Sequence, residues 1–138
     1  MGVSARYLLL NGAIVLLIGL LCGAPYGMAI KRRNEELIRA WKLAHSSLSL
    51  GGATMLAIAA CFNGLGNQET FKWIISISYI ISGNGFCFAM LSEPFLGQRG
   101  LSWSGTRNNK IVYVGNSIGA LGSLVGTIAL VIASYLSL

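Results

Sequence analysis

The 138-residue sequence contains no aspartate, one histidine and only four glutamates. A catalytic triad of serine, histidine and aspartate is therefore excluded. The single histidine also cannot build a zinc site, because zinc takes three or four ligands from the protein. The glutamates lie at or near the ends of the apolar segments, and no glycine-rich phosphate loop follows a strand. These absences exclude most hydrolases, kinases and proton relays built from carboxylates.

Charged residues are also scarce. They make up 10% of the chain, whereas hydrophobic residues make up 54% and the mean hydropathy is +0.68. Soluble domains carry about 25% charged residues. The net charge of +6 does not indicate nucleic-acid binding, because the basic residues sit beside apolar segments, as they do in membrane proteins. The length allows one domain, so we expect a single transmembrane domain over residues 1–138.

The three cysteines indicate neither a disulfide framework nor a metal site. Cys22, Cys61 and Cys87 lie in different apolar segments and lack metal-ligand spacing. We interpret them chiefly as small apolar residues that pack between helices. The apolar run after Arg6 continues past Cys22 to Ile30, which predicts a retained first helix rather than a cleaved signal peptide. This is consistent with a bacterial inner membrane.

Long apolar runs account for most of the sequence. They predict an all-α integral membrane protein, a bundle of four transmembrane helices at about residues 7–30, 41–63, 71–95 and 111–138. Each run is long enough to cross about 30 Å of hydrocarbon. Helices are expected because lipid offers no hydrogen bonds to the backbone.

The basic residues predict the orientation of the bundle. Only Arg6 and Lys72 flank one side, whereas eight basic residues lie on the other. Those eight are Lys31, Arg32, Arg33, Arg39, Lys42, Arg99, Arg107 and Lys110. Because cytoplasmic loops are rich in lysine and arginine, we expect both termini on the non-cytoplasmic side.

Glycines recur at four-residue spacing in the first and last predicted helices. Such spacing allows helix backbones to approach closely, within one subunit or between subunits. The glycines concerned are Gly19, Gly23, Gly27, Gly115, Gly119, Gly122 and Gly126.

Few polar side chains inside the predicted helices can carry chemistry. His45 can supply one axial ligand to a haem whose other face stays open, or it can hydrogen-bond to a carbonyl near the membrane surface. On the third helix, Tyr79, Gly83, Cys87 and Met90 share one face, with Asn84 and Ser82 to either side. The hydroxyl and the thiol either line a pocket or bond neighbouring helices.

Three short motifs occur in order along the chain. WKLAHS at residues 41–46 opens the second predicted helix, Gly85-Phe86 lies in the third, and QRGLSWSG at residues 98–105 follows it. Together they resemble the styrene oxide isomerases over about residues 10–135. The resemblance implies a four-helix membrane protein that assembles as a homotrimer and holds haem b at the subunit interface.

The resemblance also implies an activity. His45 would be the axial ligand of the haem iron, and ferric haem would act as a Lewis acid that opens a hydrophobic epoxide to an aldehyde. The sequence departs from the family at three polar positions. Cys87 stands where the family has tyrosine, Tyr79 where it has aspartate, and Gly51 where it has asparagine. Candidate catalytic residues are therefore Tyr79, Cys87 and Asn84.

Three functions stay open from the sequence. The first is an isomerase in which Tyr79 takes over the positioning of the substrate. The second is a haem-binding protein without epoxide chemistry, such as a sensor, carrier or redox partner. The third is a small haem-free transport or assembly protein. In each case we expect the lipid bilayer, and no nucleic acid, as a partner.

Overall fold

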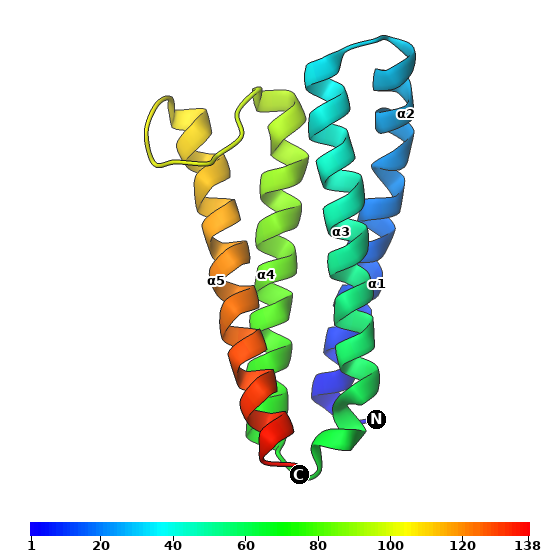
Figure 1. Cartoon of the computed structure of the whole chain (residues 1–138), viewed down its shortest axis with the longest axis vertical. Helices are drawn as coiled ribbons and strands as arrows, with labels where there is room; N and C mark the ends of the chain where they lie inside the picture. Colours follow the sequence, from blue (N-terminus) through cyan, green and yellow to red (C-terminus); the bar gives the residue numbers. More distant parts are fainter.

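The computed structural model describes all 138 residues as a bundle of helices (Figure 1). The elements are α1 (Val3–Leu21), α2 (Gly23–Lys31), α3 (Glu35–Cys61), the short 3₁₀ helix η1 (Phe62–Leu65), α4 (Glu69–Leu96) and α5 (Arg107–Tyr135). Four helical stretches, α1 with α2, α3 with η1, α4 and α5, are long and apolar enough to cross a membrane. The predicted all-helical architecture with four such stretches is confirmed.

Two helices begin well before the predicted spans. α3 begins at Glu35 and α5 at Arg107, because polar side chains cap their first turns. The Asn34 side chain accepts a hydrogen bond from the backbone N–H of Leu37, and Thr106 accepts one from Asn109. Caps of this kind satisfy N–H groups that have no partner within the helix. Hydropathy marks only the apolar part of a helix, so it missed these polar turns.

The first predicted span is not one continuous helix. It breaks at Cys22, between α1 and α2. Pro25 is the physical cause, since proline has no backbone N–H and its ring crowds the carbonyl four residues earlier, which is that of Leu21. The break lies close to His45, the residue around which the candidate site is built.

The bundle consists of two closely packed helix pairs, α1 with α3 and α4 with α5 (Figure 1). Glycines allow the two helices of each pair to approach each other closely. A Cβ at Gly52 would lie 2.7 Å from the Leu16 Cα, and a Cβ at Gly119 would lie 2.6 Å from the Phe86 ring. Gly27 alone among the predicted glycines makes no close contact within the chain, because a Cβ there would meet nothing within 4 Å; its role between subunits stays a prediction.

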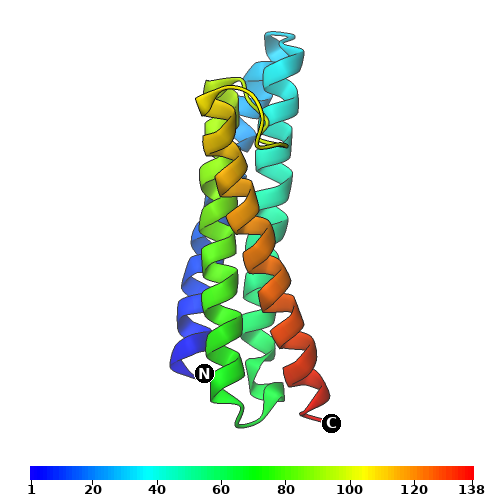
Figure 2. The same ribbon diagram turned by 90° about the vertical axis from the view of Figure 1, so that its left-hand side faces the viewer.

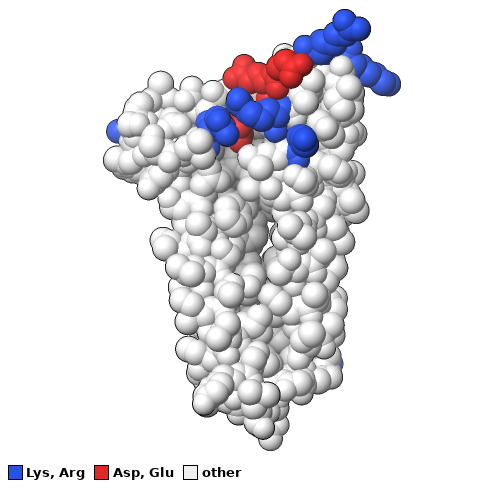
Figure 3. All heavy atoms as spheres, in the orientation of Figure 1, with Lys and Arg blue, Asp and Glu red and all other residues white.

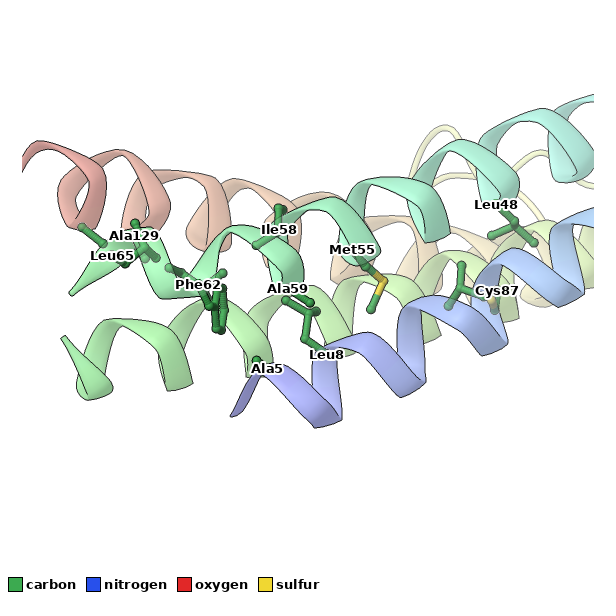
Figure 4. Close-up of a cluster of buried hydrophobic side chains, with 13 residues drawn as sticks. Ala5, Leu8, Leu48, Met55, Ile58, Ala59, Phe62, Leu65, Cys87 and Ala129 are labelled. Carbon is green, nitrogen blue, oxygen red and sulfur yellow. The ribbon is translucent and has the colours of Figure 1, made fainter. Parts of the chain in front are cut away.

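Buried apolar side chains from the long helices and η1 form the core (Figure 4). Leu8 on α1, Leu48 on α3 and Ile75 on α4 are almost completely buried. Many larger apolar side chains instead cover the outside of the bundle, such as Leu50, which is 70% exposed. Water would make such a surface costly, whereas lipid does not.

Charge gathers at one end of the bundle (Figure 3). This end, here called the basic end, holds residues 31–42 and 97–110 with their eight lysines and arginines. Both termini lie at the opposite end (Figures 1 and 2). The sidedness of the termini in the membrane stays a prediction from the distribution of charge.

Candidate functional site

His45 lies in α3, about 15 Å along the helix from Glu35 at 1.5 Å per residue. Its side chain is half-buried, and its Nδ1 is 2.8 Å from the backbone carbonyl oxygen of Gly19, near the end of α1. A carbonyl only accepts hydrogen bonds, so Nδ1 carries the proton and donates it. The lone pair of the neutral imidazole is then on Nε2, the nitrogen available to a metal.

Helix α2 forms a wall beside the imidazole of His45. The Tyr26 ring stacks on it, with 6.3 Å between ring centroids and 23° between planes. A Cβ at Gly23 would lie 3.3 Å from His45 Cε1, so glycine leaves just enough room for the ring. Because the helix breaks at Cys22, Gly23 and Tyr26 lie at the start of the new helix α2.

No cluster of metal ligands surrounds His45. Nowhere in the chain do three or more His, Cys, Asp or Glu side chains come together in a group that could hold a metal ion. A bare metal ion would therefore be held poorly. A haem brings four equatorial nitrogens of its own and needs only one axial side chain, so the residues present fit that cofactor.

A cavity of about 430 Å³ lies between the two helix pairs, and Figure 3 shows the molecule hollowed between α3 and α4. Its volume is within the range of small-molecule sites. α3 and α4 supply most of the wall, and α1 and α5 contribute one residue each. The lining residues are Val15, Ser47, Leu48, Leu50, Gly51, Thr54, Met55, Tyr79, Gly83, Phe86, Met90 and Ser123.

His45 and the cavity are on opposite faces of α3. At 100° per residue, the cavity residues Ser47, Leu50, Gly51 and Thr54 lie about 140–240° around the helix from His45. His45 instead contacts α1 and α2. Leu48 and Met55, which also line the cavity, lie only about 60–80° from His45, so the cavity is centred on the far side of α3 from the imidazole but extends towards it.

A family model described as styrene oxide isomerase matches residues 4–135, nearly the whole chain. The chain belongs to the styrene oxide isomerase family. A comparison with curated proteins found no match. The resemblance expected from the three short motifs is confirmed.

Two of the three positions at which we expect this styrene oxide isomerase family member to depart from the family pattern lie on the cavity wall. Gly51 from α3 and Tyr79 from α4 both line it. Cys87 is buried in the core but is not part of the wall. Gly83 and Met90 share the wall with Tyr79, as the spacing on the third helix predicts.

Asn84 lies apart from this group. It lines a separate hollow between α4 and α5, together with Ile81 and Phe88, and its amide nitrogen donates to the Ile80 carbonyl at 2.8 Å. The structure thus brings Tyr79 to the cavity and Asn84 to a different face of α4. The catalytic roles of Tyr79, Cys87 and Asn84 stay predictions.

Sequence reasoning missed the hydroxyl groups around the cavity. Ser47 and Thr54 lie on the same face of α3 as Gly51, at helical spacing, which was a usable signal. Ser123 and Thr127 come from α5 and meet α4 only through the tertiary fold. Thr127 Oγ1 is 2.8 Å from the Tyr79 hydroxyl oxygen.

The loop that carries the QRGLSWSG motif is ordered by two asparagines of α5. Asn109 accepts from the Gly100 N–H at 3.1 Å and donates to the Ser102 and Ser104 carbonyls, each at 2.8 Å. Asn116 donates to the Gly100 carbonyl at 3.3 Å. Gly100 has a positive φ of 58°, a region that favours glycine. The motif therefore has a structural function in shaping the basic end.

Proposed function

We propose that this chain is a membrane-embedded isomerase that converts a small hydrophobic epoxide into an aldehyde, with haem b held by His45. The proposal is carried by the Nδ1–Gly19 hydrogen bond, which leaves Nε2 without a protein partner. When bound, ferric haem supplies a Lewis acid for the epoxide oxygen. Membership of the styrene oxide isomerase family supports the isomerase class.

The chain's own residues would bind and orient the substrate. The apolar wall of the cavity, with Leu48, Met55 and Phe86, suits a hydrophobic molecule that partitions from lipid and keeps water away. Tyr79 is the residue to which we assign orientation of the substrate, because its side chain is on this wall. Cys87 lies on the same helix but outside the wall, so we assign it packing beside the site.

The placement of His45 and the cavity on opposite faces supports a homotrimer with the haem at the subunit interface. In a ring of identical copies, one face of each subunit meets a different face of the next. The His45 face of one subunit would then adjoin the cavity face of its neighbour. The bilayer surrounds this assembly, with the basic end on the cytoplasmic side of a bacterial inner membrane.

The test is an absorption spectrum of the detergent-purified protein, recorded oxidised and then reduced with dithionite. We expect a Soret band in the wild type, its loss in His45→Ala and its retention in Ser46→Ala, a neighbouring control whose hydroxyl bonds only its own helix. Unchanged haem content in His45→Ala would remove the ligand assignment. Conversion of epoxides to aldehydes by the haem-loaded protein then tests the reaction.

A haem-binding protein without epoxide chemistry is the second candidate. It is favoured by Gly51, Tyr79 and Cys87, which stand where the family resemblance leads us to expect other polar residues. A Soret band without turnover of any epoxide would support this candidate. Reduction of the haem by a physiological donor would add to it, since the isomerisation needs no net electron transfer.

A further inference from the structure

The direction of the hydrogen bond between Tyr79 and Thr127 follows from their neighbours. A threonine hydroxyl has one proton to donate. Thr127 Oγ1 is 2.7 Å from the Ser123 carbonyl oxygen, which only accepts, so the Thr127 proton is used there. The 2.8 Å bond between the two hydroxyls must then use the Tyr79 proton. The Tyr79 oxygen is left with lone pairs and no proton to offer a ligand.

The same holds for two other hydroxyls of the cavity wall. Thr54 Oγ1 donates to the Leu50 carbonyl at 2.9 Å, and Ser123 Oγ donates to the Ala120 carbonyl at 2.9 Å. Both hydroxyl protons are therefore used within the helix, and each oxygen has only lone pairs left to offer a ligand. Ser47 is the one wall hydroxyl that makes no hydrogen bond within the chain, so it alone keeps a free proton.

Packing holds the Tyr79 ring in place. A Cβ at Gly126 of α5 would lie 2.8 Å from Tyr79 Cδ2 and 2.9 Å from Cε2, so the ring lies directly against that glycine. The ring thus bridges α4 and α5, and its hydroxyl reaches Thr127 one residue further along. Turning the hydroxyl towards the cavity as a donor would break the bond to Thr127.

We infer that the cavity binds a small hydrophobic ligand through acceptor groups, so that it favours a ligand with a hydrogen-bond donor or a positively charged centre. Thr127 is the positioning residue that sets this preference through Tyr79. The inference deepens the proposed function, on which it rests for its substrate. Opening an epoxide places positive charge on a carbon, which lone pairs stabilise, whereas the epoxide oxygen finds hardly any donor on this wall.

The experiment compares two ligands of nearly equal shape, 1-phenylethanol, which has a hydroxyl donor, and acetophenone, which has only an acceptor. Their affinities for the full-length detergent-purified protein are measured by isothermal titration calorimetry. A net hydrogen bond contributes about 1 kcal/mol, so we expect the alcohol to bind about fivefold more tightly than the ketone in the wild type. Differences in detergent partitioning cancel when this ratio is compared between variants.

Three variants assign the preference to its residues. Thr127→Val keeps the shape but frees the Tyr79 proton, so the preference should reverse towards the ketone. Thr127→Ser is the matched control and should keep the wild-type ratio. Ser47→Ala removes the free donor on the wall and should raise the preference for the alcohol. Thr127 is exposed, so the valine should be tolerated.

The outcomes separate this inference from the isomerase proposal. A wild type that prefers the ketone, an unchanged ratio in Thr127→Val, or no binding of either ligand would each overturn the inference. A ratio that reverses in Thr127→Val supports the inference even if no epoxide is turned over, in which case the isomerase proposal fails alone. If the protein turned over an epoxide but the affinity ratio stayed unchanged in Thr127→Val, this inference would fail and the isomerase proposal would stand.

Discussion

Gly19 connects helix packing to the candidate haem ligand, so substituting it should affect both. A Cβ at this position would lie 2.8 Å from the Leu48 carbonyl carbon and from the Ser49 hydroxyl, inside the contact of α1 with α3. Backbone atoms cannot move aside as a flexible side chain can. Gly19→Ala must therefore push α1 away from α3, and the Gly19 carbonyl that accepts from His45 moves with it.

The magnitude follows from two opposing effects. Overpacking a close contact costs about 1–3 kcal/mol, whereas alanine gains about 1 kcal/mol over glycine in helix propensity. We expect Gly19→Ala to lower the free energy of unfolding by up to about 2 kcal/mol and to reduce haem retention. Gly27→Ala is the matched control, because its Cβ meets nothing within 4 Å and only the propensity gain applies.

The assay is unfolding of the detergent-purified proteins with a denaturant, followed by circular dichroism, together with the Soret absorbance per protein at each concentration. Gly27→Ala should unfold at the wild-type midpoint or above it, with its haem content unchanged. If Gly19→Ala behaved like Gly27→Ala in both measurements, the close approach of α1 and α3 and its link to His45 would be refuted.

Two further predictions concern the basic end. Asn109→Ala removes three hydrogen bonds to the loop at residues 97–106. Limited proteolysis in this loop should therefore become at least several-fold faster, while the helical circular dichroism signal stays unchanged. Equal cleavage rates in the variant and the wild type would contradict the proposed role of Asn109. Glu93 is 6% exposed and its Oε1 has no hydrogen-bond partner. Burying a carboxylate oxygen without a hydrogen bond is costly, and the charges of Arg39 and Arg99 offset only part of this cost. Glu93→Leu should therefore leave stability unchanged or raise it by about 1 kcal/mol in the same unfolding assay. A large loss of stability would show that Glu93 has a stabilising partner.

The sequence alone was sufficient to predict the helical architecture. Lipid requires long apolar segments and leaves helices as the only form for each, so hydropathy predicts four of them. His45 was also a candidate from the sequence, because a lone histidine within an apolar helix is conspicuous, whereas its role as haem ligand rests on the family resemblance and stays a prediction. Pro25 carried a signal for the break at Cys22, but the continuous apolar run around it concealed that signal.

Tertiary packing decided which side chains meet. The position of Asn84 on a different face from the cavity, the Gly19 carbonyl as partner of His45, and the bond from Tyr79 to Thr127 depend on how each helix is rotated against its neighbours. Helical periodicity places residues on faces of one helix, but it does not say which face turns towards which neighbour. That choice depends on the close contacts of several helices at once, here set by glycines such as Gly52 and Gly119, and only the folded bundle contains them.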